Sequence, residues 1–593
     1  MRNRLALFVQ VTSVAAALLL SGSVSASAQA PDKIFFGNIL TMVEDDLFAE
    51  AVAVTGDRII GVGSIEEMRQ LADDATEMID LEGGTMLPGF IDTHGHMLGA
   101  GTRELLSVNL KPPPMGTMTK MDELVAALKE RADANPDASL IQGSGYDDTL
   151  LEEMRHPNKN DLDRVSTTRP VVITHISGHL AAGNSKALEV AGVTADTPNP
   201  DGGRIVKDPE TGEPTGVMEG NARAILNGLI PQPSLEESLA GLRRGSEMWA
   251  ASGFTTATDQ LREASLIDDV YRAGLESGDL FVRLEIWPRI TTMEKAREFP
   301  TVISGTDLSG GRHMITQGPL KLQIDGSPQG YTAHFSQPYT TQRPQDDGNY
   351  KGFPYWDDLE AFRSFVKSLH RDGWQVTIHA NGDQGIQDAL DAIGAAQEAY
   401  PREDARHTIQ HAQFTRPDQL DQMAALDVTA CFFIGHTFYW GDRHKNVFFG
   451  KHRAEHMSPV RGAIDRGVRS TTHTDTPVTR IDGIQMIWSS VNRVSTGGDV
   501  IGAAQRVTPL EAVKAITSEA AWQYHHEDLK GTIEPGKLAD FVILSDDPLS
   551  VGHLDPMKIK DIKVLQTILG GETVFSGVTE SIVARHFRDN PIP

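Results

Sequence analysis

The 593-residue sequence contains a single cysteine, Cys431. One cysteine excludes an internal disulfide, a cysteine-based zinc finger and an iron–sulfur cluster. Basic residues are also in deficit, because 54 Lys and Arg stand against 81 Asp and Glu, which gives a net charge of −27. Nucleic acid and anionic membrane surfaces repel such a body, so neither is expected as a partner. Since cysteine is so scarce, metal ligands would come from carboxylates and from the 20 histidines.

Long apolar runs are absent except at the N-terminus. Two arginines precede a mostly apolar stretch at 5–20, and Ala28-Gln29-Ala30 follows as a small-x-small cleavage site. This order is typical of a secretory signal peptide, so residues 1–30 are expected to be removed by cleavage near Ala30. An uncleaved anchor is the alternative, but the run is short for a membrane span. We expect a secreted or periplasmic bacterial protein that makes no membrane contact after cleavage.

The length predicts a large domain together with a smaller one. Hydrophobic residues make up 39% and charged residues 23%, the composition of a packed globular protein. Both ends of the mature chain carry strand and turn signals, such as Lys33-Ile-Phe-Phe near the start and a hairpin pattern at 567–575. We therefore predict one β-sandwich domain built from residues 31–85 and 521–593.

The middle of the chain alternates apolar runs with helical patterns, the order of βα units. This order predicts an α/β fold, a (β/α)8 TIM-type barrel over residues 86–520, with its active site at the carboxyl ends of the strands. Residues 109–250 are too many for a simple crossover and are predicted to form a large insertion over the barrel mouth. Eight runs are candidate barrel strands, near residues 86–94, 254–259, 281–287, 319–325, 374–379, 407–411, 428–433 and 468–475.

Helices are predicted between several of these strands. Residues 357–369 and 384–396 have amphipathic patterns, and Thr508-Pro-Leu-Glu511 is a capping box that opens a helix to about Ala521. Residues 326–355 are rich in Gly, Gln, Pro and Tyr and predict a long functional loop.

The strongest local motif is Leu87-Pro-Gly-Phe-Ile-Asp-Thr-His94-Gly-His96. A predicted strand ends here, and two histidines follow at positions i and i+2. On an extended chain these side chains lie on one face, so both can bind one metal ion. An isolated His-x-His pair is weak evidence, but the preceding Pro-Gly-Phe-Ile-Asp makes the chain resemble the amidohydrolase superfamily of metal-dependent hydrolases. Pro535-Gly-Lys-Leu-Ala-Asp540 resembles the closing motif of that superfamily.

The resemblance implies further metal ligands at strand ends. His379 ends the predicted fifth strand, His411 the sixth and Asp475 the eighth, and the superfamily places metal-binding histidines and an aspartate at these positions. In this sequence His473-Thr-Asp475 stands where the family usually has Gly-Ser-Asp. Each residue alone has a structural explanation, but all of them on one predicted rim are hard to explain by packing.

Gly318-Pro-Leu-Lys321-Leu-Gln-Ile-Asp325-Gly-Ser is similar to the branch called amidohydrolase family 3, which includes N-substituted formamide deformylases. The resemblance implies that Lys321 is carboxylated and bridges two metal ions, expected to be zinc. His94, His96 and Asp475 would hold one ion, and His379 and His411 the other. The alternative is an ordinary charged Lys321 that pairs with Asp325 or with a substrate anion.

The predicted insertion contains Thr174-His-Ile-Ser-Gly-His179, which resembles the family's His-rich segment near the substrate. We predict that His179 is a catalytic residue that donates a hydrogen bond to the substrate carbonyl, although a structural histidine is an equal alternative. Five further residues are expected to bind substrate: Tyr146, His175, Asp325, His334 and Trp440.

The predicted activity is hydrolysis of a C–N bond in a small amide, N-formyl or cyclic amide substrate. A metal-bridging hydroxide would attack the carbonyl carbon, and Asp475 would act first as base and then as acid. An esterase or lactonase with the same metal centre is one alternative, and a catalytically inactive periplasmic binding protein is another. A serine hydrolase is disfavoured because no Gly-x-Ser-x-Gly elbow occurs. A homo-oligomer is compatible with the sequence but not indicated by it.

Overall fold

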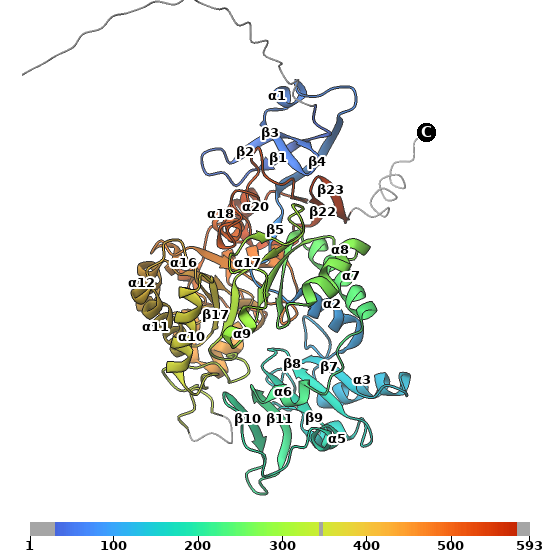
Figure 1. The fold of residues 1–593 in the computed structure, drawn as a ribbon, viewed down its shortest axis with the longest axis vertical. Coiled ribbons are helices and arrows are strands. Elements are labelled where there is room, and N and C mark those ends of the chain that lie inside the picture. Colours follow the sequence, from blue (N-terminus) through green and yellow to red (C-terminus); the bar gives the residue numbers. More distant parts are fainter. Residues whose placement is uncertain (1–29, 343–347, 578–593) are drawn as a thin grey trace, which may run out of the picture.

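The computed structural model describes residues 30–342 and 348–577. The predicted signal peptide up to residue 29 therefore lies outside the described residues. The molecule has three parts in a row, with a sheet from both chain ends, a central body of strands and helices, and a sheet from residues 108–220 at the far end (Figure 1). No helix in the described ranges is both long and apolar enough to cross a bilayer.

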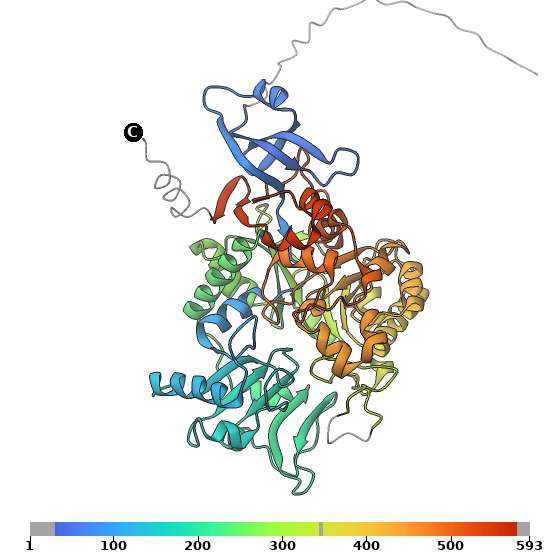
Figure 2. The same cartoon turned by 180° about the vertical axis from the view of Figure 1, so that it is seen from behind.

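Strands from both ends of the chain are hydrogen-bonded into one seven-stranded sheet. Its order is β23-β22-β21-β4-β1-β2-β3. The antiparallel pair β4–β21 joins the ends, with Phe541 opposite Pro88. The reverse view shows the C-terminal strands beside the N-terminal ones (Figure 2). The strands are β1 (Lys33–Leu40), β2 (Phe48–Thr55), β3 (Arg58–Gly63), β4 (Glu77–Pro88), β21 (Phe541–Leu544), β22 (Val564–Leu569) and β23 (Glu572–Ser576).

Asp540 of the closing motif ties this sheet to the central body. Its two carboxylate oxygens accept hydrogen bonds from Nε and Nη2 of Arg283, at 2.6 and 2.8 Å. Both side chains are buried, and the bidentate geometry suits guanidinium and carboxylate. The motif that the sequence shares with the superfamily therefore has a structural role here.

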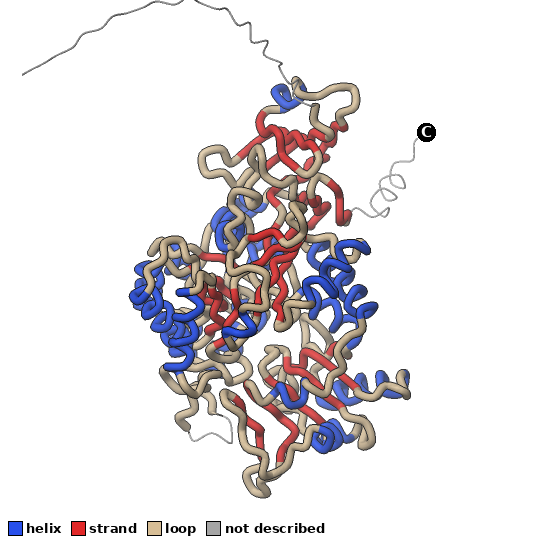
Figure 3. The backbone as a smooth tube through the Cα atoms, viewed as in Figure 1, coloured by secondary structure: helices blue, strands red, loops and turns tan. Residues whose placement is uncertain are grey.

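The central body contains two five-stranded sheets, flanked by helices (Figure 3). Their orders are β14-β15-β13-β12-β5 and β16-β17-β18-β19-β20, and all neighbours except β14–β15 run parallel. Each of the eight predicted runs contains one of these strands. The strands are β5 (Phe90–Ile91), β12 (Phe254–Leu261), β13 (Arg283–Pro288), β14 (Thr306–Asp307), β15 (Ile315–Gln317), β16 (Leu320–Gln323), β17 (Val376–Ala380), β18 (Thr408–His411), β19 (Thr429–Phe432) and β20 (Ser470–Thr472).

The predicted single closed barrel is not seen as one continuous ladder. Gly318-Pro319, at the start of the predicted fourth strand, separates it from β15, so that β15 pairs with β13 and β16 pairs with β17. Proline has no N–H to donate to a ladder, which explains a break at this point. One isolated bridge, between Arg289 and Lys321, connects the two sheets there. At the other junction the Asp475 N–H donates to the His94 carbonyl at 3.2 Å, but no ladder forms.

Helices cover the outer side of the central sheets. The predicted helices at 357–369 and 384–396 correspond to α10 (Leu359–Arg371) and α11 (Asp383–Ala399). The capping box at Thr508 is present and opens α18 (Pro509–Lys514), but the predicted helix to Ala521 is broken. Its second part is α19 (Ser518–Gln523). The break lies where the Ile516 carbonyl accepts the Ile91 N–H at 2.8 Å instead of continuing the helix.

Residues 108–220 form a six-stranded sheet with the order β10-β11-β9-β8-β7-β6. The strands are β6 (Val108–Asn109), β7 (Ile141–Tyr146), β8 (Val171–His175), β9 (Leu180–Gly183), β10 (Gly203–Lys207) and β11 (Pro214–Gly220), and the helices include α3 (Met121–Ala134) and α6 (Arg223–Asn227). The predicted insertion range also contains α7 (Leu235–Ala251), which packs against α2 (Met97–Leu106) of the central body. A Cβ on Gly101 would lie 2.0 Å from the Gly241 carbonyl oxygen, so this helix contact requires glycine.

Candidate functional site

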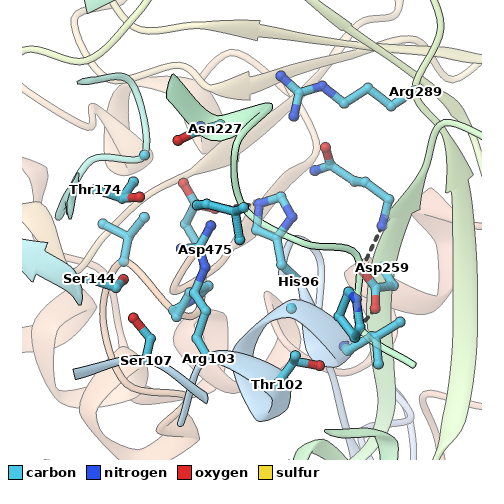
Figure 4. A pocket seen from close by; sticks show the side chains of 18 of the residues that line it. His96, Thr102, Arg103, Ser107, Ser144, Thr174, Asn227, Asp259, Arg289 and Asp475 are labelled. Atoms are coloured by element: carbon cyan, nitrogen blue, oxygen red, sulfur yellow. Dashed lines mark hydrogen bonds and ion pairs between the residues drawn. The ribbon is translucent and has the colours of Figure 1, made fainter. Parts of the chain in front are cut away.

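A cavity of about 520 Å³ lies between the carboxyl ends of the central strands and the six-stranded sheet. Its wall combines His94, His96, Lys321, His379 and Asp475 from the central body with residues of the sheet at 108–220. Figure 4 shows His96 and Asp475 within this wall, with Arg103, Asn227 and Arg289 around them. The cavity therefore lies where the barrel architecture predicts an active site.

His94, His96 and Asp475 form a compact cluster of possible metal ligands. The Nε2 atoms of the two histidines lie 3.2 and 3.3 Å from the same oxygen, Oδ1 of Asp475. A metal ion with bonds of about 2.1 Å at tetrahedral angles holds its ligands roughly 3.4 Å apart. The pKa of Asp475, which burial alone would raise, is held well below its usual range by the neighbouring histidines. This carboxylate is therefore ionised and available as a ligand.

The backbone of this cluster has an unusual conformation at Asp475. Asp475 has a φ of 54°, in the left-handed region that a non-glycine residue seldom adopts. The conformation directs its N–H to the His94 carbonyl, while the His96 N–H donates to the Thr476 carbonyl at 2.9 Å. Strain of this kind persists where the surroundings hold it and is concentrated at functional sites.

His94 is held in place by buried neighbours. Its N–H donates to Asp92 at 3.1 Å, and the indole N–H of Trp249 donates to the same carboxylate at 3.0 Å. Its ring is stacked on Trp287 with centroids 5.3 Å apart. Gln260 lies 3.3 Å from Nδ1 of His94. These contacts leave Nε2 directed at Asp475.

His379 is the penultimate residue of β17 and His411 the last residue of β18, and their ring centroids lie 4.2 Å apart. Nε2 of His379 lies 3.1 Å from both the Gly326 carbonyl and Nδ2 of Asn381. A proton on Nε2 would be donated to the carbonyl and would leave the lone pair of Nδ1 for a metal ion, whereas the Asn381 amide favours the other tautomer. His411 is fully buried, has a φ of 74°, and neither ring nitrogen has a hydrogen-bond partner in the described ranges.

Lys321 lies on β16, opposite Thr377 of β17. Its Nζ lies 3.4 Å from Nε2 of His94 and 5.7 Å from the centre of the Trp287 ring. Burial is the main cause that lowers the pKa of Lys321 to about 7. A substantial fraction of this amine is therefore neutral at physiological pH and nucleophilic.

The donor set fits divalent metal ions that prefer nitrogen and carboxylate ligands. Burial, followed by the charges of Lys321 and neighbouring histidines, holds the pKa values of His94, His379 and His411 well below their usual range. Neutral imidazole is the form that binds metals. The buried ring nitrogens of His411 lack hydrogen-bond partners, which raises the free energy of the folded state unless a ligand binds them. His473, whose ring centroid lies 4.8 Å from that of His411, is likewise buried without a partner for either nitrogen among the described residues.

His179 lines the cavity and lies against His379, with ring centroids 4.9 Å apart. Its Nδ1 lies 2.8 Å from the Tyr355 hydroxyl and 3.2 Å from Nε2 of Gln323. Arg289 donates to Oε1 of Gln323 at 2.6 Å, which fixes the orientation of that amide. Both neighbours of Nδ1 then act as donors, so Nδ1 accepts and the proton is on Nε2. His179 can therefore donate a hydrogen bond from Nε2.

Asp325 does not line the cavity. It is fully buried, and its carboxylate accepts the backbone N–H groups of Asn381, Gly382 and His334 at 3.0, 2.8 and 3.0 Å. Burial raises the pKa of Asp325 to about 7. Its contacts hold the loop that follows His379, so its place is behind the site and not in the substrate cavity.

Four other predicted substrate-binding residues also lie outside the cavity wall. His175 and Trp440 both bind an acidic pair: Nε2 of His175 lies 3.1 Å from Asp148, and the indole of Trp440 donates to Asp147 at 2.8 Å. The Tyr146 hydroxyl lies 3.4 Å from Nδ1 of His156. His334 lies 3.4 Å from Asp388. None of these four side chains lines the cavity, so the structure gives no support to their predicted contact with substrate.

Several cavity residues were not singled out from the sequence. Gln260 and Arg289 lie at the ends of β12 and β13, and Gln323 follows Lys321 at i+2, so the strand-end rule could have found them. Arg103 and Arg223 carry no comparable signal, because α2 and α6 bring them to the cavity only in the tertiary structure, and Tyr355 of the long loop contacts the cavity residue His179.

Comparisons with known proteins agree with this geometry. The sequence model described as "Amidohydrolase family" matches residues 77–575. The chain is 28% identical to the YtcJ protein of Bacillus subtilis over 91% of this chain and 98% of that protein. It is 26% identical to the N-substituted formamide deformylase of Arthrobacter pascens over 91% of this chain and 97% of that protein.

A solved structure has a similar fold. The crystal structure of an uncharacterized metal-dependent hydrolase from Pyrococcus horikoshii OT3 superposes with a TM-score of 0.68 and 22% identity, over 88% of this chain and 99% of that one. The family match spans most of the sequence and includes every residue of the cluster around the cavity. The chain belongs to the amidohydrolase family.

Proposed function

We propose that this protein is a metal-dependent hydrolase that cleaves the C–N bond of a small amide, N-formyl or cyclic amide substrate. The observation that carries the proposal is the meeting of His94, His96, Asp475, His379 and Lys321 at one cavity, although they come from four separate strands and the segments that follow them. We further infer that the two central sheets form one distorted (β/α)8 barrel. The bridge at Arg289 and Lys321 and the hydrogen bond between Asp475 and His94 support this inference.

Two divalent cations, taken as zinc, would be held by this set. His94, His96 and Asp475 would bind one ion, and His379 and His411 would bind the other. Lys321, as a carbamate formed by its neutral amine with carbon dioxide, would lie between them. The support for the carbamate is chemical, because a buried ammonium would repel both cations, whereas a carbamate is anionic and offers two oxygens.

When bound, these cations would lower the pKa of a water molecule and polarise a carbonyl oxygen. Asp475 would be the residue that transfers the proton. Its ionised carboxylate would accept a proton from the attacking water and return it to the leaving nitrogen. The left-handed backbone at Asp475 and its contacts to two histidines fix the direction of this carboxylate.

His179 would stabilise the developing oxyanion. Its Nε2–H faces no partner in the described ranges, whereas Nδ1 is held by Tyr355 and Gln323. A donor fixed in advance costs no reorganisation at the moment of reaction, and this makes it effective.

The substrate class rests on the similarity to the formamide deformylase of Arthrobacter pascens. The same residues would also act on an ester or lactone, so the test is a panel of N-formyl, N-acyl, lactam, ester and lactone compounds given to metal-loaded protein. Asp475→Asn is the control. Preferred turnover of amides by the wild type alone supports the proposal, preferred turnover of esters or lactones favours the alternative, and no turnover favours a binding protein.

We propose that the protein is secreted or periplasmic and that the mature chain begins near Pro31. The support is the leader pattern at residues 1–30. N-terminal sequencing of protein from its native host tests this, and a chain that still begins at Met1 would contradict it.

A further inference from the structure

The cavity is basic although the protein as a whole is strongly acidic. Apart from histidine, its charged lining consists of Arg103, Arg223, Arg289, Lys321, Asp259 and Asp475. Asp475 and Lys321 belong to the proposed metal centre. Asp259 is engaged by internal donors, since it accepts the Leu98 N–H at 2.6 Å and the Tyr271 hydroxyl at 3.0 Å. The three arginines have no carboxylate within ion-pair distance among the described residues, although the charge of Asp475 acts on Arg103 and Arg289.

Arg289 has no acidic partner within ion-pair distance among the described residues, and its Nη2 donates a hydrogen bond to the neutral Gln323. Burial, followed by the charges of Arg223 and Arg262, lowers the pKa of Arg289 to about 9. Arg283, which is more deeply buried, is paired with Asp540, whereas the partly exposed Arg289 has no such partner. The unpaired charge at Arg289 is therefore a cost that a bound anion would remove.

Arg223 is the second such residue. It opens the short helix α6, and its Nη1 donates to the Gly220 carbonyl at 2.8 Å. Its guanidinium lies 6.0 Å from the centre of the Tyr355 ring, but no carboxylate in the described part of the chain lies within ion-pair distance. Asn227 lies one helical turn after Arg223, on the same side of α6, and also lines the cavity.

Arg289 lies close to the proposed reaction centre, and the charge of Arg223 acts on both Arg289 and His179. Arg289 is the bridge partner of Lys321 across the junction of the two sheets. Through Gln323, the same guanidinium is connected to His179. A group held by Arg289 would therefore lie near the bond that the proposed centre cleaves.

We propose that the substrate carries a carboxylate close to its scissile C–N bond, and that Arg223 and Arg289 bind this carboxylate. The inference rests on the proposed hydrolase function and names its substrate class. One hydrogen-bonding group of each guanidinium is already used, by Gly220 and Gln323. The remaining donors match the two oxygens of a carboxylate, and the charge-assisted bonds are strong in an enclosed site. A basic cavity in an acidic body would also concentrate anions at its entrance.

The test compares N-formyl and N-acetyl amino acids with their C-terminal amides. The amides keep the N-acyl group and nearly the same size, but they are neutral because a carboxamide replaces the carboxylate. The ratio of kcat/KM for acid over amide is measured for metal-loaded wild type, Arg289→Gln and Arg223→Gln. We expect the wild type to prefer the acids by about tenfold or more, and each variant to lose about 10- to 100-fold in this ratio. Equal turnover of acids and amides by the wild type would overturn the inference and leave the hydrolase proposal standing.

Arg262→Gln is the matched control, because Arg262 is exposed and its charge acts on Arg289, but it does not line the cavity. It should leave the ratio within about twofold if direct contact matters more than the long-range field. A loss as large as that of Arg289→Gln would contradict binding by the cavity arginines.

A second measurement separates this inference from the proposed function. N-Methanesulfonyl amino acids resist hydrolysis, so their binding can be measured by calorimetry whether or not any substrate is cleaved. Binding of the acid but not of its amide, lost in Arg289→Gln, supports the carboxylate site even if nothing is hydrolysed. Equal binding of acid and amide overturns it, and an equal response to phosphonate analogues would show a general anion site instead of a carboxylate site.

Discussion

Nζ of Lys321 lies 3.4 Å from Nε2 of His94, at the junction where the two central sheets meet. The two residues are 227 positions apart in sequence. An ammonium at this distance would compete with any cation bound by His94. A carbamate on the same nitrogen would instead bind that cation, and for this reason the modification is central to the account.

Removal of the Lys321 amine should therefore disrupt metal binding. We expect Lys321→Ala to lose most of its bound metal and about 10²-fold or more of its activity, because His379 and His411 alone do not complete a site. Elemental analysis by plasma mass spectrometry, together with circular dichroism to verify folding, measures this. Lys321→Glu is the matched variant, and it should retain more metal than Lys321→Ala because a carboxylate is restored. Full metal content in Lys321→Ala would show that no bridge exists.

Asp475→Asn tests proton transfer separately from metal binding. The amide keeps an oxygen for the metal but is not a useful base at neutral pH. Turnover should fall about 10²- to 10⁴-fold, the usual contribution of a general acid–base group, while part of the metal remains bound. Parallel metal analysis and steady-state kinetics measure the two effects. A variant with full metal and nearly unchanged kcat would remove Asp475 from the chemistry.

His179→Phe should lower kcat more than it raises KM. The hydrogen bond from Nε2 is proposed to strengthen as the oxyanion develops, so its loss should cost about 10²-fold in kcat. Tyr355→Phe removes a donor to Nδ1 without touching the substrate, so we expect a smaller loss and a shift of the pH–rate profile as the imidazole loses its fixed tautomer. An increase in KM alone for His179→Phe would indicate a purely structural or binding role.

The buried cluster at Glu285 predicts a pH dependence of stability. Glu285 on β13 lies 2.6 Å from Nε2 of His526 and 3.3 Å from Nζ of Lys530. Burial alone would raise the pKa of Glu285, but these partners lower it to about 2 from 4.5. Because the folded-state pKa is the lower one, the stabilisation is present above pH 4.5 and is lost as the pH falls toward 2. It amounts to roughly 3 kcal/mol.

Denaturant unfolding of wild type and Glu285→Gln at pH 7 and at pH 3 measures this effect. The variant should be less stable at pH 7, and the difference should shrink at pH 3. A difference that stays constant between the two pH values would contradict the ionised cluster.

Much of the central architecture could be predicted from the sequence. The eight apolar runs each contain a strand, because buried parallel strands need continuous apolar segments of this length. The break before the fourth run was readable in principle from Gly318-Pro319, but β15, which precedes it and pairs with β13, was not predicted because its pairing depends on neighbours far along the chain. The helix break near Ile516 was not readable, because its cause is a hydrogen bond to Ile91.

Some residues of the site could likewise be predicted from the sequence, and others could not. His94, His96, His379, His411 and Asp475 could be placed because each follows a strand, and parallel strands bring their carboxyl ends together. The predicted substrate contacts at Tyr146, His175, His334 and Trp440 could not be judged from sequence, because their internal partners come from distant segments. Arg223 reaches the cavity through the six-stranded sheet, an arrangement that local pattern does not encode.

Anomalous diffraction at the zinc edge, from crystals of protein purified without chelator, tests the central claim most directly. We expect two anomalous peaks in the cavity, one among His94, His96 and Asp475 and the other beside His379 and His411, with density for a carbamate on Lys321 between them. A cavity without anomalous peaks, or metal bound only at the separate cluster of Asp147, Asp148 and His175, would contradict it.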